Sequence, residues 1–393
     1  MRYAGIDIGS ERHVVAIVDE RTEVVVAPTG FGEDATGYAS LLARLGESVD
    51  VLIAMEATGH YWQNLFAVLT GRGFAVALLN PLSTRRFAQV GLERTKTDAI
   101  DALSIAKLAA LKRPVPAKLT DELTRELREQ VRLRDRLQQD LGDRVRELHR
   151  VVDLAFPEFT RHVKDLGCLT TTAVLSVFPT AKSLAITSVR SVAQIVYDGR
   201  HRVGEELARA LIAAAKQSVG QHHGPIYARE VKYFCEDIRI LRERLREIDD
   251  DLRSQVDQHE VATLLTTIEG IGTNTAARLV AELGDPAHWK SAAALAAHVG
   301  VVPQIHHSGK HTPLRAGIGP LGDRRLRSAL WMPVLGAVRR NPWLRHHYRR
   351  LRANGKLAKV ALIACMRKLL AAIYSVAKHR RAFEPRLPTA TPA

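Results

Sequence analysis

The feature that most constrains this fold is a long helical seam in the second half of the chain. Between 227 and 256 the apolar residues recur at spacings that alternate between four and three, which is the heptad pattern of helices that pack side by side. The seam consists of Tyr227, Val231, Phe234, Ile238, Leu241, Leu245, Ile248, Leu252 and Val256. A second helical pattern covers 121–152, and a short helical insertion, 156–222, lies between the two. We therefore expect an antiparallel coiled coil.

The residues before this helical region alternate between strand and helix patterns. Three short strands are predicted within 3–27. The patterns that follow predict a helix at 34–45, a strand at 49–55, a helix at 59–72, a strand at 74–79 and a helix at 98–112. This order is typical of a mixed sheet covered by helices, so the fold class is α/β at the start of the chain and mostly helical afterwards.

These patterns divide the chain into four parts. We expect an α/β domain over 1–115, a coiled-coil helical spacer with its insertion over 116–258, a mostly helical C-terminal domain over 259–384 and a disordered tail over 385–393. A chain of 393 residues is long enough for two or three domains, each with its own core.

Four carboxylates stand at the ends of predicted elements in the first domain. Asp7 ends the first strand, Glu56 ends the apolar strand at 49–55, and Asp98 and Asp101 share one face of the helix at 98–112. An acidic residue at the end of a buried strand destabilises the fold unless a cation offsets its charge. Mg²⁺ is such a cation, since it prefers carboxylate oxygens as ligands. The set favours a ribonuclease-H-like fold with two Mg²⁺ ions, which would clamp the attacking and leaving oxygens of a phosphodiester.

Three of these acids also have a plainer interpretation. The pair at 98 and 101 can be a solvated first helical turn whose charges favour the helix dipole. Asp7, followed by Ile8-Gly9-Ser10, is also compatible with the phosphate-binding turn of sugar kinases and actin-like ATPases. That fold needs a second Asp-Gly phosphate loop and a Gly-Gly adenosine loop, and the sequence contains neither. The metal site is the interpretation that accounts for all four acids together.

The charge of the chain indicates a polyanionic partner. The net charge is +15, and residues 324–381 contain sixteen Lys or Arg and no Asp or Glu. A solvated face normally mixes both signs, so this segment predicts a nucleic-acid surface. Aromatic and His residues interleave with it, as core residues or as base-stacking platforms: Trp331, Trp343, His346, His347 and Tyr348. The turn Gly270-Ile271-Gly272 resembles a helix-hairpin-helix element that holds a phosphate, or is a plain helical turn.

The sequence predicts a cytoplasmic protein with no membrane partner. No apolar run approaches the roughly 18 residues that span a bilayer. The first residues enter a strand pattern directly, without the charged and apolar regions of a secretion signal. Ser308, in the polar loop His306-His307-Ser308-Gly309-Lys310, is on sequence alone an ordinary loop serine.

Several short motifs occur along the chain in a fixed order. They are Gly5-Ile6-Asp7-Ile8-Gly9, Met55-Glu56-Ala57-Thr58-Gly59, Thr95-Lys96-Thr97-Asp98-Ala99-Ile100-Asp101-Ala102, Glu269-Gly270-Ile271-Gly272, Gly300-Val301-Val302-Pro303, Ser308-Gly309-Lys310, Gly322-Asp323 and Leu326-Arg327. With these motifs the chain resembles, over almost its full length, the DEDD transposases of bacterial insertion sequences, which are bridge-RNA-guided recombinases.

The resemblance implies a fold and a mechanism. It implies an N-terminal RuvC-like nuclease domain, a coiled-coil spacer and a C-terminal transposase domain that supplies a catalytic serine. By position, Asp7, Glu56, Asp98 and Asp101 would bind Mg²⁺, and Ser308 would attack the phosphodiester and form a phosphoserine link. The implied partners are donor and target DNA, a structured guide RNA encoded by the element, and further copies of the chain in a dimer or tetramer, associated with the nucleoid when active.

The sequence departs from the family pattern at two places, and two rival functions stay open. His307 stands where the family often has the first of two serines, which leaves Ser308 as the candidate; the stretch 318–321 lacks a Lys that is common in the family. One rival is a RuvC-like Holliday-junction resolvase, in which water is the nucleophile and Ser308 is idle. The other is a non-catalytic nucleic-acid-binding protein that uses only the basic C-terminal half.

Overall fold

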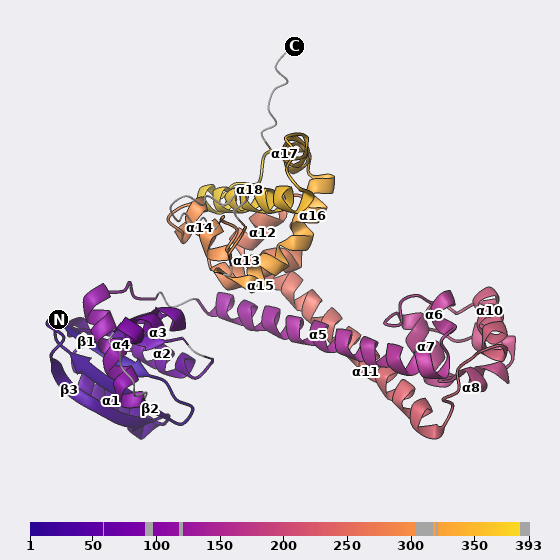
Figure 1. The fold of residues 1–393 in the computed structure, drawn as a ribbon, viewed down its shortest axis with the longest axis horizontal. Helices are drawn as coiled ribbons and strands as arrows, with labels where there is room; N and C mark the ends of the chain where they lie inside the picture. Colours follow the sequence, from indigo (N-terminus) through magenta and orange to yellow (C-terminus); the bar gives the residue numbers. More distant parts are fainter. Residues whose placement is uncertain (58, 91–96, 118–120, 304–316, 320, 386–393) are drawn as a thin grey trace, which may run out of the picture. The chain divides into compact units, whose positions relative to one another are not determined.

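In the computed structural model the described residues are 1–57, 59–90, 97–117, 121–303, 317–319 and 321–385. They fall into two compact units, Met1–Thr120 and Asp121–Ala393, which we call the N-terminal unit and the helical unit (Figure 1). The predicted loop around Ser308 and the predicted tail from 386 onward lie outside the described residues. The predicted division into four parts stays a prediction.

The N-terminal unit contains a five-stranded mixed sheet, as predicted. Its strands are β1 (Arg2–Asp7), β2 (Arg12–Val18), β3 (Val24–Gly32), β4 (Val51–Glu56) and β5 (Ala75–Leu79). They lie in the order β3-β2-β1-β4-β5, with β1–β2 and β2–β3 antiparallel and β1–β4 and β4–β5 parallel. The continuous apolar run of β4 fits its position between β1 and β5, because a strand between two parallel neighbours is buried on both faces.

Four α-helices accompany this sheet: α1 (Ala35–Leu45), α2 (Trp62–Gly71), α3 (Pro81–Val90) and α4 (Asp98–Lys112), with a short 3₁₀ turn, η1 (Ser48–Asp50), before β4. The sequence pattern does not predict α3, since Pro81 indicates the end of the preceding strand. Proline is also favoured in the first turn of a helix, where its missing N–H costs nothing, and here it begins α3.

Helix α4 packs directly on β1, and the sheet separates the two cores of the unit. One core lies on the opposite face of the sheet and includes Ile6, Ile53 and Met55. The other joins α4 to the face that carries Tyr3 and Leu52. The contact is close at Gly5, where an added Cβ would lie 2.2 Å from the backbone N of Ala106 and 2.3 Å from the carbonyl O of Ala102. Glycine at this position therefore allows the helix to rest on the strand.

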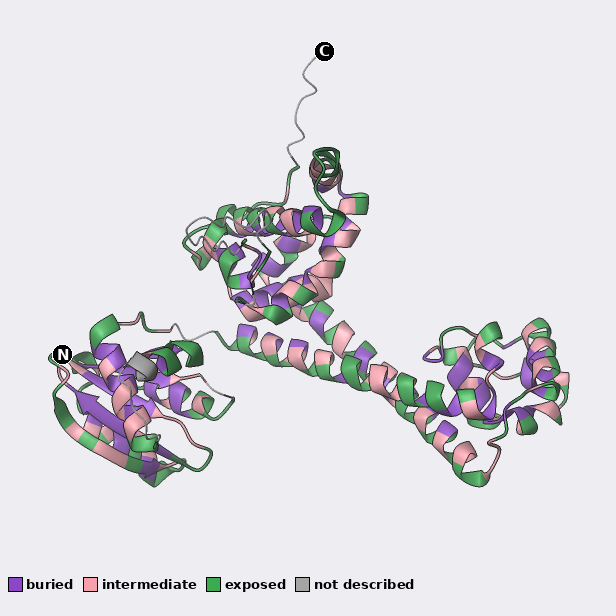
Figure 2. Ribbon diagram, viewed as in Figure 1, coloured by how far each residue is buried: buried purple, intermediate pink, exposed green. Residues whose placement is uncertain are grey.

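The helical unit is organised around two long helices, α5 (Glu122–Ala155) and α11 (Pro225–Gln258). Leu127 near the start of α5 shares a core with Val256 near the end of α11. Leu137 packs with Leu241 and Leu245, and the last turns of α5 share a core with the first half of α11. The two helices thus run antiparallel along their length, with buried residues on their facing sides (Figure 2). The supercoil of a coiled coil stays a prediction.

Smaller helices form a core at each end of this pair. The insertion contributes α6 (Phe159–His162), α7 (Leu169–Val177), α8 (Ala181–Ala185), α9 (Val189–Ala193) and α10 (Glu205–Lys216). The C-terminal part contributes α12 (Glu260–Thr266), α13 (Thr273–Leu283), η2 (Pro286–His288), α14 (Ala292–Val299), α15 (Arg324–Ala329), α16 (Trp331–Arg340), α17 (Pro342–Ala353) and α18 (Ala358–His379).

Helix α18 bears on the expectation that no segment of the chain spans a membrane. Within the described part of the chain it is the single helix long and apolar enough to cross a membrane, with a mean hydropathy of 1.8 over the best window. Arg367 and Lys368 interrupt the apolar run, which is why the sequence shows no continuous span. More than half of that window (56%) is buried inside the protein, and its residues belong to the C-terminal core. Its apolar character is that of a core helix.

The heptad seam packs against α5 of the same chain. Disrupting the seam should therefore destabilise the helical unit. Ile238 and Leu245 are 0% and 7% exposed, so replacing both by Asp would bury two charges between α5 and α11. We expect this double variant to lose helicity and to melt well below the wild-type protein, as measured by circular dichroism. The matched control places Asp at Ile226 and Tyr233, which are more than half exposed on the same helix, and should melt as wild type. Normal melting of the core variant, with dissociation of an oligomer, would show instead that the seam joins subunits.

Candidate active site

Asp7 and Glu56 end neighbouring strands on the same side of the sheet. The parallel register of β1 and β4 pairs Ile6 with Met55, so the two acids follow side by side at the carboxyl ends of their strands. Side chains alternate between the two faces of a strand. Since Ile6 and Met55 belong to the core on the opposite face, Asp7 and Glu56 point to the face that α4 covers. Both acids are half-buried.

The other two acids lie in the first turn of α4. The Oγ1 of Thr97 accepts a hydrogen bond of 3.3 Å from the backbone N–H of Ile100, so Thr97 caps the helix as predicted. Asp98 is exposed and Asp101 is half-buried. All four predicted acids therefore belong to elements that meet on one face of the sheet.

Thr84, on α3, is a polar neighbour that the sequence pattern does not identify. Its hydroxyl donates a hydrogen bond of 2.5 Å to Oε2 of Glu56, and its side chain is almost fully buried. A hydrogen bond of this kind fixes the orientation of a carboxylate, as partners of metal-binding carboxylates do. The sequence does not indicate this contact, because Thr84 is a single threonine in a helix that the sequence pattern does not predict.

The structure does not gather the acids into a complete ligand set. Over the described ranges, no three His, Cys, Asp or Glu side chains come close enough together to hold a metal ion. The chemistry of the donor set nevertheless fits a hard divalent cation, because carboxylate oxygens are the preferred protein ligands of Mg²⁺. Residues 91–96, which precede α4, and Ser308 lie outside the described residues. The roles predicted for all five residues stay predictions.

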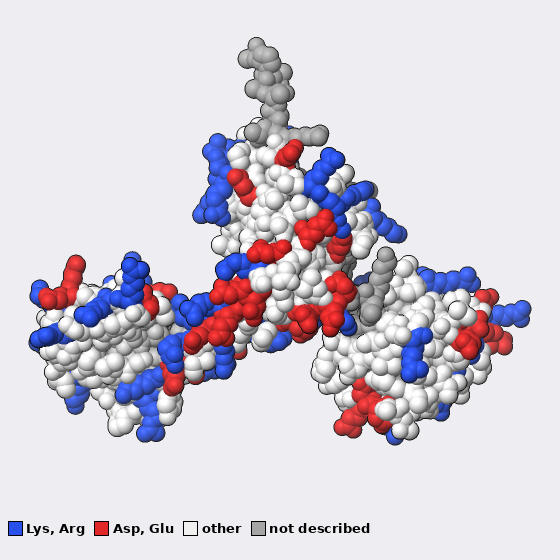
Figure 3. Space-filling model, turned by 180° about the vertical axis from the view of Figure 1, so that it is seen from behind, with Lys and Arg blue, Asp and Glu red and all other residues white. Residues whose placement is uncertain are grey.

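The basic stretch of the C-terminal part is largely without acidic partners. Of its sixteen Lys and Arg residues, only Arg380 forms an ion pair with an acid of the described chain, through contacts with Asp285 and Glu260. Lys and Arg side chains stand out along the edges of this part of the molecule (Figure 3). Unpaired cations that lie close together repel one another, so the surface is suited to an anionic partner.

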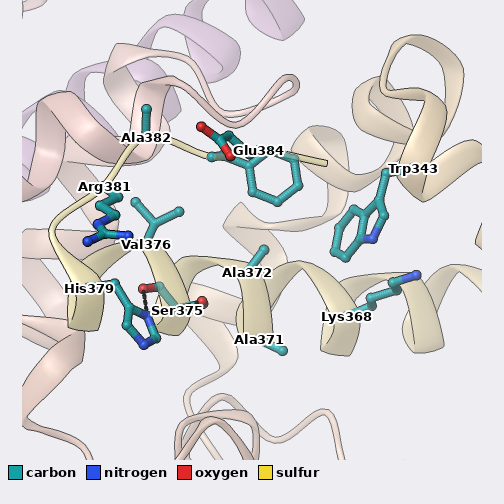
Figure 4. Close-up of a pocket in the computed structure, with 11 residues that line it drawn as sticks. Trp343, Lys368, Ala371, Ala372, Ser375, Val376, His379, Arg381, Ala382 and Glu384 are labelled. Atoms are coloured by element: carbon teal, nitrogen blue, oxygen red, sulfur yellow. Dashed lines mark hydrogen bonds between the residues drawn. The ribbon is translucent and has the colours of Figure 1, made fainter. Parts of the chain in front are cut away.

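A cleft in this region combines cations with an aromatic wall (Figure 4). Its volume is about 890 Å³, and its lining includes small residues of α18, Ala371, Ala372 and Ser375. The Nζ atom of Lys368 lies 4.2 Å from the centroid of the Trp343 ring. Burial lowers the pKa of Lys368, and the positive charge of Arg350 lowers it further.

The predicted turn between two helices is present at Gly270-Ile271-Gly272. Gly270 has φ +107°, and an added Cβ would lie 2.5 Å from the Cβ of Ala337, so only glycine fits there. Asn274, in the first turn of α13, donates a hydrogen bond of 2.9 Å to Oδ1 of Asp249. Arg134 of α5 binds the same carboxylate at 2.6 and 3.2 Å. The turn is thus tied to both long helices, and its phosphate-binding role stays a prediction.

Comparison with known proteins identifies the class of protein. A family model described as a transposase matches residues 4–157, which include Asp7, Glu56, Asp98 and Asp101. A second model, of the IS116/IS110/IS902 transposases, matches residues 262–349, which include Ser308 and the first part of the basic stretch. The protein is a transposase. The chain belongs to the IS116/IS110/IS902 transposase family.

Individual relatives agree with this assignment. The chain is 27% identical to a protein of insertion element IS116 from Streptomyces clavuligerus, over 98% of this chain and 97% of the relative. It is 26% identical to the pilin gene-inverting protein of Moraxella bovis, over 85% of this chain and 82% of the relative. A solved structure of T. thermophilus RuvC with a Holliday junction substrate matches with 18% identity and a TM-score of 0.23, over 30% of this chain and 99% of that chain. This TM-score is too low to establish a shared fold.

Proposed function

We propose that the N-terminal unit is a Mg²⁺-dependent nuclease domain in which Asp7, Glu56, Asp98 and Asp101 act together. The observation that supports it most is the position of Asp7 and Glu56 at adjacent parallel strand ends, on the face covered by the helix that begins with the other two acids. The strand order is compatible with a ribonuclease-H-like fold. Bound Mg²⁺ would supply Lewis-acid stabilisation of the charge that develops on phosphate oxygens. Replacement of single acids, followed by measurement of strand cleavage, tests the proposal.

We further propose that Ser308 is the nucleophile of strand exchange. Its Oγ attacks the phosphorus of a DNA strand, and the bond from phosphorus to the 3′ oxygen breaks. The serine proton is lost to a base, and the leaving oxygen takes up a proton to become a free 3′-hydroxyl. The phosphoserine link conserves the bond energy, so a different 3′-hydroxyl can attack it, rejoin the strand and release the serine without ATP.

Rejoining is supported by one named relative. The Moraxella bovis relative is a pilin gene-inverting protein, and inversion of a gene requires that each cut end be joined again. A reaction that only cleaves, as in a resolvase that uses water, would leave the ends to other proteins. We therefore place this chain among enzymes that both cut and rejoin DNA.

The proposed partners follow from the unpaired cations of the C-terminal part. Donor and target DNA, together with a structured guide RNA encoded by the element, would supply the anionic charge that this surface lacks. A guide RNA would read the sequence by base pairing, so the protein itself would need to grip mainly the backbone. We propose that a dimer or tetramer of this chain acts in the cytoplasm at the nucleoid, which allows Ser308 of one subunit to reach the acids of another.

The cleft beside Trp343 predicts a specific contribution to nucleic-acid affinity. Stacking of a base on an aromatic side chain contributes about 1–3 kcal/mol, which corresponds to roughly 5- to 150-fold in Kd. We expect Trp343→Ala to weaken binding of single-stranded DNA or RNA within this range, as measured by fluorescence anisotropy. Trp343→Phe keeps an aromatic ring and should lose less. Wild-type affinity in a correctly folded Trp343→Ala protein would show that this ring only packs.

A further inference from the structure

A buried histidine lies behind the turn that follows Asp7. His13, on β2, is 1% exposed and packs against Phe31 with a ring-centroid distance of 5.1 Å. The backbone N–H of Gly9 donates a hydrogen bond of 3.2 Å to its Nδ1, and its Nε2 lies 2.6 Å from Oε2 of Glu33. Because Nδ1 accepts a hydrogen bond, the ring proton is on Nε2 and is donated to Glu33. Both ring nitrogens are therefore used.

Glu33 also accepts hydrogen bonds from side chains on two helices. The hydroxyl of Tyr38 on α1 donates to Oε2 at 2.6 Å, and the side-chain amide of Asn64 on α2 donates to Oε1 at 3.2 Å. Burial alone would raise the pKa of Glu33, but the hydrogen bonds from Tyr38, His13 and Asn64 outweigh it and lower the pKa. Glu33 is accordingly an ionised acceptor at neutral pH, held by three side chains.

These contacts reach both strands of the candidate active site. Gly9 is two residues beyond Asp7, in the turn from β1 to β2, and an added Cβ there would lie 2.2 Å from the carbonyl O of Arg12. The backbone N–H of Glu33 also donates to the carbonyl O of Glu11 at 3.0 Å, which ties the same turn to the end of β3. Asn64 belongs to the helix that follows β4 and Glu56. One carboxylate thus fixes the segments that leave both strand ends.

We propose that His13 and Glu33 are positioning residues that set the orientation of Asp7, and so the affinity of the site for a divalent cation. They would not touch DNA or metal; they would act through the Gly9 turn. The inference rests on the proposed role of Asp7 and Glu56. It assigns to a buried His and its half-buried Glu partner the task that partners of metal ligands perform. Loss of such partners typically costs 10- to 100-fold in metal affinity or activity.

The experiment compares two replacements of His13 in the full-length protein. His13→Leu removes both hydrogen bonds, whereas His13→Gln offers one donor and one acceptor at a similar separation. We expect His13→Leu to weaken Mn²⁺ binding, measured by calorimetry, by about 10- to 100-fold, and to raise the Mg²⁺ concentration for half-maximal cleavage likewise. His13→Gln should recover most of both, and DNA binding by the basic surface should stay unchanged in both variants.

Matched carboxylate variants separate positioning from stability. Glu158 in the helical unit is buried and, like Glu33, accepts several hydrogen bonds, here from Ser218 and Val219. Glu158→Gln is therefore the control for Glu33→Gln. We expect only Glu33→Gln to weaken Mn²⁺ binding, which also tests the inference if His13→Leu does not fold. Wild-type Mn²⁺ affinity in folded His13→Leu or in Glu33→Gln would overturn it. If Asp7→Asn itself binds Mn²⁺ and cleaves normally, the proposed nuclease site is wrong. That outcome can be told apart from failure of the positioning role, in which only the His13 and Glu33 variants behave as wild type.

Discussion

Asp7→Asn is expected to abolish Mg²⁺-dependent strand cleavage while leaving nucleic-acid binding within a few-fold of wild type. The substitution keeps the size of the side chain but removes the negative charge of a proposed metal ligand at the end of β1. Changing only the partner of a metal ligand costs 10- to 100-fold, so loss of a ligand should exceed about 100-fold. Asp101→Asn, in the first turn of α4, should have the same effect, because ligands of one metal site act as a unit.

The measurement is the cleavage rate of labelled DNA at saturating protein, with binding followed separately by gel shift. The control is Asp50→Asn, which removes an exposed carboxylate from the same unit immediately before β4 and should cleave normally. A near-wild-type rate in either Asp7→Asn or Asp101→Asn would end the two-metal account. Loss of binding in parallel with cleavage would indicate that the variant is misfolded or that these acids serve the structure alone.

Ser308→Ala is expected to lower recombination by more than about 1,000-fold, the scale of losing a catalytic nucleophile. Binding should not change, since removal of one hydroxyl alters no charge. Recombination is measured by joining of donor and target DNA in the presence of the proposed guide RNA. The control is Ser328→Ala, which alters an exposed serine on α15 in another basic segment, just after Arg327. Normal recombination by Ser308→Ala would mean that the serine assignment is wrong.

Local patterns predict most elements of the N-terminal unit. The apolar run at 49–55 corresponds to β4 at Val51–Glu56, and Thr97 marks the start of α4. Such signals depend on residues near in sequence, so they can be read without the fold. Local signals do not predict helix α3, because it follows a strand directly. Pro81 can indicate the end of that strand as well as the start of a helix.

The candidate site depends on long-range order that the sequence does not contain. Each acid can be placed at the end of its own element, but the adjacency of Asp7 and Glu56 requires that β4 pair with β1 rather than with β3. Strand order results from packing of the whole sheet. The same holds for His13 and Glu33, which are 20 residues apart and resemble ordinary polar residues in their local sequence.

The heptad seam shows the same limit in another form. Its spacing correctly indicates a long helix with one apolar face, and six of its nine residues are buried. Spacing alone does not say whether the covering helix belongs to the same chain. In this structure α5 covers it, so the seam provides no free surface for assembly, and the proposed oligomer needs contacts of another kind.

The most direct test of the central claim is to trap the wild-type protein on its DNA with Mg²⁺ and guide RNA and to map any covalent adduct. The account predicts a protein–DNA adduct that survives denaturation, maps to the peptide containing Ser308, and is lost in Asp7→Asn. That result would connect the acids of the N-terminal unit to the serine of the helical unit in one reaction. An adduct at another residue, or cleavage without any adduct, would contradict it, and the second outcome would favour a resolvase that uses water.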